Sequence, residues 1–329
     1  MTFFDDRAKT TQAKLSSLAA VVSTHLGADE TRIMRDTCIY VVGSGGRGEM
    51  SSHSDVDLFV ARADRSPSEV DAFVVQHAIA RALFQLKLPD PSGGGEYLGM
   101  HTAKSLCEQM GTPADDATNT FTARMLLLLE SCPLVNEEAY RRLVGRVIGA
   151  YWQNAKGHED DYQPFVLVND VVRYWRSLLL HYVAKNTEKA KELLAENAVP
   201  ERRLRSYKLR MSRALTCFST LAAILATTSK GGVRSEDILA IVGERPIERL
   251  ERARTPATGT IIDEVHALYE TFLRKTDAPK KDLLTSFADR AFSDEAAREG
   301  DAFGNALFDL LLALGHEGRA KMLFRYMVV

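Results

Sequence analysis

The stretch that most constrains this chain runs from Cys38 to Ala61 and reads CIYVVGSGGRGEMSSHSDVDLFVA. It begins with a short apolar run, Cys38–Val42, that stops at a glycine, as a buried strand does. The cluster Gly43–Gly46 has almost no side-chain bulk and predicts a flexible connection. A second strand is expected from Asp55 onward, because acidic and apolar residues alternate there. The pattern predicts two strands joined by a glycine-rich turn.

Asp55 and Asp57 are expected to project from the same face of the second strand. Because side chains alternate faces along a strand, Val56 and Leu58 would point into a core while the two carboxylates stand ~7 Å apart. Such a pair suits a hard divalent cation, Mg²⁺ or Mn²⁺, which keeps several waters and binds substrate phosphates. The spacing predicts a metal site at Asp55 and Asp57.

The glycine-rich turn ahead of these acids is expected to bind phosphate. Gly43, Ser44 and Gly45 can present backbone N–H groups to phosphate oxygens. Arg47 adds a guanidinium fork that fits phosphate oxygens, and the alternative is an ion pair with Glu49. The turn and the acids together predict a site for a metal-bound phosphate compound.

Two other interpretations compete for the same residues. Gly43, Gly45 and Gly48 satisfy G-x-G-x-x-G, but that dinucleotide-binding motif needs a helix, a second strand and an acidic residue about 20 residues later. Here the acids follow after only a few residues, and the phosphate-loop motif is absent because Glu49 and Met50 follow Gly48. The remaining alternative is an ordinary turn with two solvated aspartates, which explains neither the glycine cluster nor a strand that begins with two acids.

The motif GSGGRGEMSSHSDVDLFV resembles the signature of the DNA polymerase β-like nucleotidyltransferase superfamily, in which a Gly-Ser turn precedes Asp-x-Asp on the next strand. Its Gly-Arg-Gly-Glu and His-Ser-Asp surroundings are most similar to the protein-PII uridylyltransferases and related signal-transduction nucleotidyltransferases. The later segments GEYLGMHT, FTARMLLLLES and NDVVRYWR resemble a bacterial branch of these enzymes. The resemblance therefore extends over roughly Cys38–Ser219.

This resemblance implies an α+β chain. Residues 1–118 would form a polymerase-β-like nucleotidyltransferase domain with a small mixed sheet and helices, and residues 119–329 an all-helical substrate-binding bundle. The residues agree, because strand signals almost vanish after Phe121, and we expect the boundary near Asp116–Thr120. The content of 45% hydrophobic and 26% charged residues is typical of a globular protein.

Composition narrows the partners. The 42 basic and 44 acidic residues exclude a globally basic nucleic-acid binder, although not a local basic patch. The four cysteines lie far apart without zinc-ligand spacing. No signal-peptide pattern is present, and no apolar run approaches the ~20 residues of a membrane span, so we expect a cytoplasmic enzyme without a membrane partner. The C-terminal FRYMVV is apolar enough to dock on its own bundle or on a second subunit, which would make a homo-oligomer.

The reaction that the resemblance implies is Mg²⁺-dependent transfer of a nucleoside monophosphate from a nucleoside triphosphate such as ATP to an acceptor hydroxyl, with release of pyrophosphate. Asp55 and Asp57 would hold the metal, Gly43 and Ser44 would cradle the β- and γ-phosphates, and Arg47 would offset charge on the pyrophosphate. Similarity to the uridylyltransferases favours a protein hydroxyl as acceptor. The alternatives are an RNA-end nucleotidyltransferase and a catalytically degenerate nucleotide-binding regulatory protein.

Relatives of this kind often carry a third carboxylate on a later strand, as a metal ligand or general base. Glu96, at the start of an expected strand over Glu96–Thr102, is the best-placed candidate by sequence order. His101 is a weaker candidate. The alternative that Glu96 merely borders the strand stays open.

Two later helices carry polar residues of interest. A helix expected over Val168–Val183 places Asn169, Arg173 and Arg176 at i, i+4 and i+7, away from its apolar stripe. We expect this face to line the active-site cleft and bind the triphosphate; plain solvent exposure is the alternative.

A second helix, expected over Arg202–Ala226, carries six basic residues and no acid between Arg202 and Arg213. They are Arg202, Arg203, Arg205, Lys208, Arg210 and Arg213. Such a run is usually a solvated helix face. The alternative is that one or two of these side chains, Lys208 among them, hold phosphate.

Overall fold

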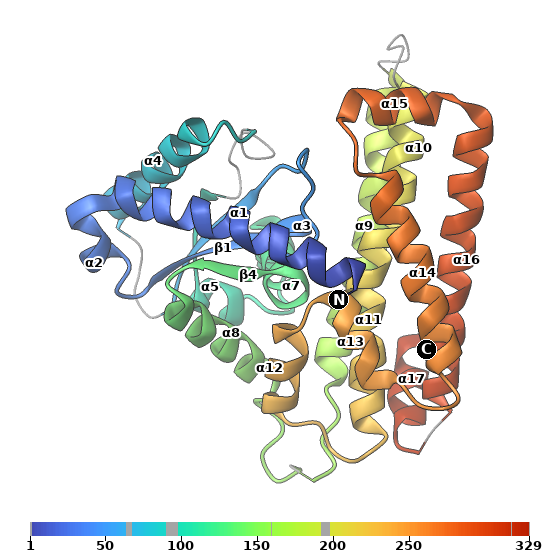
Figure 1. The fold of residues 1–329 in the computed structure, drawn as a ribbon. Helices are drawn as coiled ribbons and strands as arrows, with labels where there is room; N and C mark the ends of the chain where they lie inside the picture. The colour runs from blue at the N-terminus through green and yellow to red at the C-terminus, as the bar shows by residue number, and fades with distance from the viewer. Residues whose placement is uncertain are drawn as a thin grey trace. The chain divides into compact units, whose positions relative to one another are not determined.

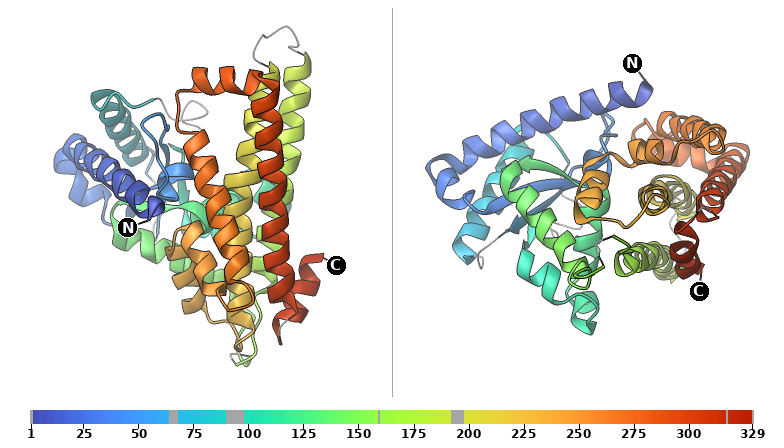
Figure 2. Two further views of the ribbon diagram at one scale, coloured as in Figure 1. Left: turned by 45° about the vertical axis from the view of Figure 1, so that its right-hand side comes forward. Right: turned by 90° about the horizontal axis from the view of Figure 1, so that it is seen from below.

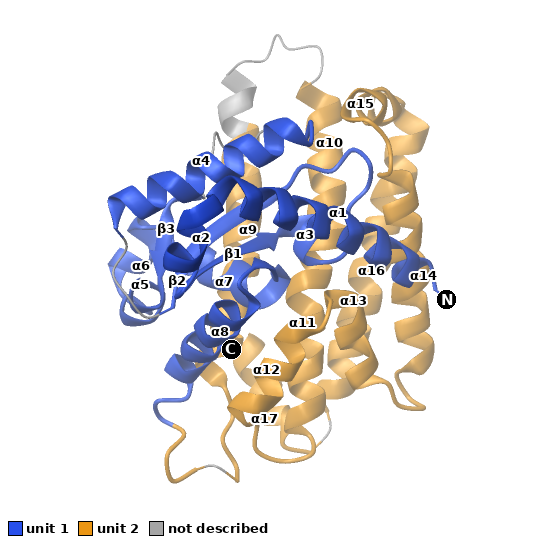
Figure 3. Ribbon diagram, turned by 60° about the vertical axis from the view of Figure 1, so that its left-hand side comes forward, with its two compact units in different colours: residues 1–154 blue, residues 155–329 orange. Residues whose placement is uncertain are grey.

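The computed structural model describes residues 2–63, 68–89, 98–158, 160–191, 198–316 and 318–328, with only the backbone described over 187–191. These residues form many helices and one small mixed sheet, so the chain has the expected α+β architecture (Figure 1). They divide into two compact units, residues 1–154 and residues 155–329, which are coloured separately in Figure 3. Each unit is described by itself below.

Unit 1 contains the sheet, whose strand order is β3-β2-β1-β4. Its strands are β1 (Thr37–Val42), β2 (Asp57–Arg62), β3 (Met100–Thr102) and β4 (Cys132–Val135). Its helical elements are α1 (Phe3–Leu26), η1 (Gly27–Asp29), α2 (Glu30–Ile33), α3 (Gly43–Gly46), α4 (Glu69–Gln85), α5 (Ala103–Glu108), α6 (Pro113–Ala117), α7 (Thr120–Glu130) and α8 (Glu137–Tyr151).

The strand β1 is central and is buried at every position, as its apolar sequence predicts. It pairs antiparallel with β2 and with β4, while β3 pairs parallel with β2. In the β1–β2 ladder, Val42 is the partner of Asp57. The glycine-rich turn after Val42 and the acid that begins β2 therefore lie side by side, where the C-terminal end of β1 meets the N-terminal end of β2.

Helices cover both faces of this sheet. On one face, Ile39 and Leu58 belong to a core that they share with Leu18 of α1 and Ile79 of α4. Figure 1 shows α1 and α4 on that side. On the other face, Tyr40 stacks on a phenylalanine of β2 and contacts a tyrosine of α8, with ring centroids 5.4 and 5.9 Å apart. Both long strands are thus held from two sides.

The strand β4 is the element that the sequence pattern did not predict. Pro133 lies opposite Tyr40, and a proline is tolerated there because β4 is an edge strand. Since β4 pairs with β1, it belongs to the same unit, and so do its flanking helices α7 and α8. The division between units consequently falls after Asn154 and not near residue 118, where we expected it.

The secondary structure of unit 2 consists of helices alone in its described residues. Its elements are α9 (Phe165–Lys191), α10 (Ala198–Lys208), η3 (Leu209–Arg213), α11 (Ala214–Thr228), α12 (Ser235–Gly243), α13 (Pro246–Arg249), η4 (Leu250–Ala253), α14 (Gly259–Lys275), α15 (Lys280–Ala288), α16 (Arg290–Gly315) and α17 (Ala320–Val328). Figure 2 shows the long helices α9, α11, α14 and α16 side by side, which matches the expected bundle.

One helix of unit 2 has the length and composition of a possible membrane span. The continuous segment Ala198–Thr228 is long and apolar enough, by length and composition, to cross a membrane. However, 78% of its most apolar window is buried inside the structure, as in a core helix of a bundle, so its composition is weak evidence for a membrane span. No other helix in the described ranges passes the same test.

Candidate functional site

The chain leaves β1 through α3, a single helical turn with the sequence Gly-Ser-Gly-Gly. Gly43 has a φ of 65°, in the left-handed region that favours glycine. Because Val42 pairs with Asp57, a Cβ placed on Gly43 would lie only 3.2 Å from the Oδ2 atom of Asp57. The missing side chain therefore keeps the space beside this carboxylate open.

The next two glycines serve packing. A Cβ on Gly45 would lie 2.3 Å from the side chain of Val41, and a Cβ on Gly46 would lie 1.9 Å from the carbonyl oxygen of Glu130. These glycines let the turn lie directly on β1 and on the last residue of α7. The expected contact of Gly45 with phosphate consequently depends on its backbone N–H alone.

The two acids alternate with core residues as predicted. Asp55 is exposed and Asp57 is half-buried, whereas Val56 and Leu58 are each 1% exposed. The strand begins at Asp57, so Asp55 lies in the segment that leads into it. Nearby, the hydroxyl of Ser44 has no hydrogen-bond partner among the residues that the structure describes. Two carboxylates and one hydroxyl are thus accessible at this edge.

Arg47 has a different environment from the one that phosphate binding requires. Its side chain is 7% exposed, and its Nε atom donates to Oε2 of Glu49 at 2.8 Å. A second guanidinium nitrogen donates to Glu130 at the end of α7. The structure therefore shows the alternative, the ion pair with Glu49, and the expected contact of Arg47 with a phosphate would require these buried pairs to break.

Several side chains that position the turn come from outside the motif. Thr11 of α1 accepts a hydrogen bond from the backbone N–H of Met50 at 2.9 Å. Lys14, one helical turn later, donates to the carbonyl oxygen of Ser51 at 2.6 Å. Cys132 of β4 lies beneath the turn and donates to one of its carbonyl oxygens at 3.7 Å. Burial raises the pKa of the Cys132 thiol to about 12, so the thiol keeps its proton.

Neither candidate for a third metal-binding or catalytic group, Glu96 or His101, is placed beside the two aspartates by the described structure. Glu96 lies outside the described residues. His101 belongs to β3 and stacks on Phe59, with ring centroids 5.9 Å apart. Burial lowers the pKa of His101, which favours the neutral ring at pH 7. Its ladder partner is Ala61, toward the other end of β2 from Asp57.

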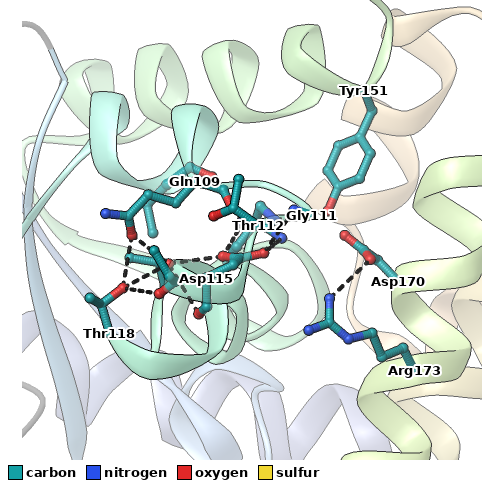
Figure 4. A network of polar contacts seen from close by, with 12 residues as sticks. Gln109, Gly111, Thr112, Asp115, Thr118, Tyr151, Asp170 and Arg173 are labelled. Carbon is teal, nitrogen blue, oxygen red and sulfur yellow. Dashed lines mark hydrogen bonds and ion pairs between the residues drawn. The ribbon is translucent and has the colours of Figure 1, made fainter.

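The remaining predicted binding residues all belong to unit 2. Asn169 and Arg176 are exposed on α9, and Lys208 is exposed at the end of α10. The side chain of Arg173 is 32% exposed and lies 3.8 Å from Asp170, as Figure 4 shows. The helix is confirmed, while contact of these four residues with a triphosphate stays a prediction.

A second buried ion pair of unit 1 has a purely structural environment. Arg124 is fully buried and donates to both carboxylate oxygens of Asp115, at 2.9 and 2.6 Å. Thr120 donates to the same carboxylate at 2.8 Å, and Gln109 and Thr118 extend the network (Figure 4). Burial alone would raise the pKa of Asp115, but these hydrogen bonds outweigh it and the pKa is lowered.

Comparisons with known proteins add no family to this geometry. Within the described ranges, no group of three or more His, Cys, Asp or Glu side chains has the arrangement of a metal site. A scan against protein-family models finds no match, and a search of curated proteins finds no similar sequence. A functional assignment therefore depends on the motif and on the geometry of the turn.

Proposed function

We propose that unit 1 is a Mg²⁺-dependent nucleotidyltransferase, which moves a nucleoside monophosphate from a triphosphate to an acceptor hydroxyl and releases pyrophosphate. The observation that carries this proposal is the position of Gly43 beside Asp57, where a side chain would lie 3.2 Å from the carboxylate. The turn and the acid meet because Val42 and Asp57 are ladder partners. A solvated turn would not need an open space at that point.

The donor set fits a hard cation. Asp55 and Asp57 are accessible oxygen ligands on one side of the chain, with Val56 anchored in the core between them. A bound Mg²⁺ would polarise the α-phosphate and lower the pKa of the acceptor hydroxyl. Ser44 would donate its hydroxyl to a phosphate oxygen, and the N–H groups of Gly43 and Gly45 would assist it. Arg47, Glu49 and Glu130 would position the turn without contacting substrate.

We extend the proposal to a protein hydroxyl as the acceptor, on the resemblance to the protein-PII uridylyltransferases. An RNA end is the alternative. The two acceptors differ in where the transferred label appears, so one assay separates them.

The test is transfer of label from each of the common nucleoside triphosphates, carried in the α-phosphate or in the γ-phosphate, with Mg²⁺ or Mn²⁺ and a cell lysate. Nucleotidyl transfer leaves the α-label on the acceptor and the γ-label in pyrophosphate. Label in protein supports the full proposal, and label in RNA supports the reaction but not the acceptor. Transfer of the γ-label alone would show phosphoryl transfer and contradict the proposal.

The residues are tested by Asp55→Ala and Asp57→Ala. Loss of a metal ligand removes several kcal/mol of transition-state stabilisation, so we expect each variant to lose activity by ~10³-fold or more. Neither side chain is buried, so the melting temperature should change little. The matched control is Asp6→Ala, at an exposed acid in the first turn of α1, which should keep full activity. Equal activity of Asp57→Ala and wild type would reject the assignment.

A further inference from the structure

Part of the basic run on α10 and η3 converges on a pocket inside unit 2. Arg203, Ser206 and Arg210 occupy positions i, i+3 and i+7, so they share one face of this continuous helix. They line a cavity of about 80 Å³ together with Phe287 of α15 and Ser293 of α16. The segment that carries Arg210, Leu209–Arg213, is a π-helical turn, a distortion that is frequent at functional sites.

The pocket carries positive charge without a matching acid in its lining. Arg203 donates to the carbonyl oxygens of Phe287 and Ala288, at 3.1 and 3.5 Å, and has no carboxylate partner among the described residues. Arg210 donates to the carbonyl oxygen of Ala297 and forms an ion pair with Asp301. Because the lining contains two guanidinium groups and no carboxylate, the charge of Arg203 is not neutralised there.

The pocket also contains hydroxyl groups that lack partners. Ser293 is 8% exposed, yet its hydroxyl makes no hydrogen bond to any residue that the structure describes. The hydroxyl of Ser206 likewise has no partner within the described ranges. Both hydroxyls line the cavity and are free to donate a hydrogen bond into it. Two such hydroxyls beside two guanidinium groups suit a ligand that accepts hydrogen bonds.

We propose that this pocket binds a tetrahedral oxyanion, namely phosphate as the free ion or as the phosphomonoester end of a small molecule. Its oxygens would accept hydrogen bonds from the guanidinium groups of Arg203 and Arg210 and from the hydroxyls of Ser206 and Ser293. Arginine suits this role because its planar fork matches phosphate oxygens and keeps its charge. A cavity of about 80 Å³ has room for several waters of ~10–15 Å³ each, which fits one phosphate group but not a nucleotide.

A neighbouring groove favours a phosphomonoester over the free phosphate ion as the ligand. Arg210 also lines this second cavity, of about 330 Å³, whose walls include Trp175, Phe218 and Phe308. Its lining is largely apolar, so it would receive the organic part of a phosphomonoester. The free ion would leave it unused.

Calorimetric titration of the full-length protein, without nucleotide or divalent cation and at constant ionic strength, tests the site with inorganic phosphate and with phenyl phosphate. Arg203→Gln should weaken binding by ~10-fold or more, because it removes a charged donor. Ser293→Ala should weaken binding by ~3–10-fold and leave the melting temperature unchanged, because the hydroxyl has no partner in the ligand-free protein. Arg202→Gln, at the exposed neighbour on the same helix, is the matched control and should bind as wild type.

The outcomes separate this site from the proposed catalytic turn. Wild-type phosphate affinity in both Arg203→Gln and Ser293→Ala, or no saturable binding into the millimolar range, would overturn the proposal. Loss of phosphate binding in Ser44→Ala, which removes the hydroxyl proposed to hold phosphate at the catalytic turn, would place the ion there and overturn it as well. Equal affinity for both probes supports the free ion. Tighter binding of phenyl phosphate that Phe308→Ala abolishes supports the phosphomonoester.

Discussion

The glycine-rich turn of unit 1 and the helices α10 and α16 of unit 2 both carry glycine and arginine, but these residues are closely packed in the turn and have open space around them in the helices. In the turn, Gly46 has a backbone oxygen 1.9 Å from its Cβ position, and Arg47 is buried between two carboxylates. On the helical face, Gly304 has no atom within 4 Å of that position, and Arg203 donates hydrogen bonds only to carbonyl oxygens among the described residues. Protein atoms fill the space around the turn, whereas space for added atoms remains beside the two helices.

This difference shows which groups of a motif remain for chemistry. A glycine or arginine in a phosphate-binding pattern can be fully used in packing, as Gly46 and Arg47 are. What remains accessible in the turn is the space at Gly43, the hydroxyl of Ser44 and the carboxylates. The guanidinium groups with room for an anion lie instead in a helical segment where no phosphate motif exists.

The strongest test of this comparison is a pair of glycine substitutions. Gly46→Ala would force a methyl group onto the carbonyl oxygen of Glu130, so we expect the free energy of unfolding of unit 1 to fall by more than about 4 kcal/mol. Gly304→Ala is the matched control, inside α16 with open space around it, and should stabilise unit 2 by about 0.5–1 kcal/mol. Urea unfolding measures both. Near-wild-type stability of Gly46→Ala would show that the turn is not closely packed.

Arginine substitutions come next in size. Arg47→Gln would leave Glu49 and Glu130 buried without their cation, and we expect a loss of about 3–5 kcal/mol. Arg203→Gln removes only hydrogen bonds to carbonyl oxygens and should cost about 1 kcal/mol. Thermal and urea unfolding of the two variants side by side give the comparison. If both variants lose the same stability, the two arginines do not differ as described.

Acidic pH should lower the stability of unit 1 more than that of unit 2. Hydrogen bonds from Arg32 lower the pKa of Asp71, and those from Arg124 lower the pKa of Asp115 against the effect of burial. A pKa below the unfolded value of about 4 gives stability that is present at neutral pH and lost as the pH falls through the folded pKa. In unit 2, Arg254 lowers the pKa of Glu251 and Lys275 lowers that of Glu295, but both acids are exposed, where solvent screening leaves little contribution to stability. We expect hydrogen exchange to detect opening of unit 1 before unit 2 below about pH 4.

The smallest loss of stability is expected for a substitution of Lys14, which also lies in unit 1. Lys14 holds the carbonyl oxygen of Ser51 much as Arg203 holds that of Phe287. Lys14→Met keeps most of the apolar stem and should cost about 1 kcal/mol. A loss as large as that of Arg47→Gln would mean that the turn depends on α1 as strongly as on its buried ion pairs.

Local patterns predicted the elements that local chemistry determines. β1 and the alternation around Asp57 were predictable from the sequence, because periodicity and glycine act within a few residues. β4 was not predictable, since a run of three half-buried residues and one buried residue that contains a proline forms a strand only when β1 lies beside it. The boundary between units moved for the same reason.

The candidate site divides in the same way. Spacing in the sequence identified Gly43, Asp55 and Asp57, whereas Thr11 and Lys14 lie 39 and 37 residues from the turn residues that they hold. Glu130 lies 83 residues from Arg47. No pattern within a single element connects such partners, because tertiary packing brings them together.

The late position of Glu130 and Cys132 has a consequence during synthesis of the chain. At ~5–20 residues per second, the ribosome needs roughly 4–17 s to pass from Arg47 to Glu130, which are 83 residues apart. Throughout that interval the apolar strand β1 lacks the partner β4 along one edge. An open apolar edge promotes pairing with other chains, so nascent chains that stall before residue 135 should be the ones that aggregate or recruit chaperones.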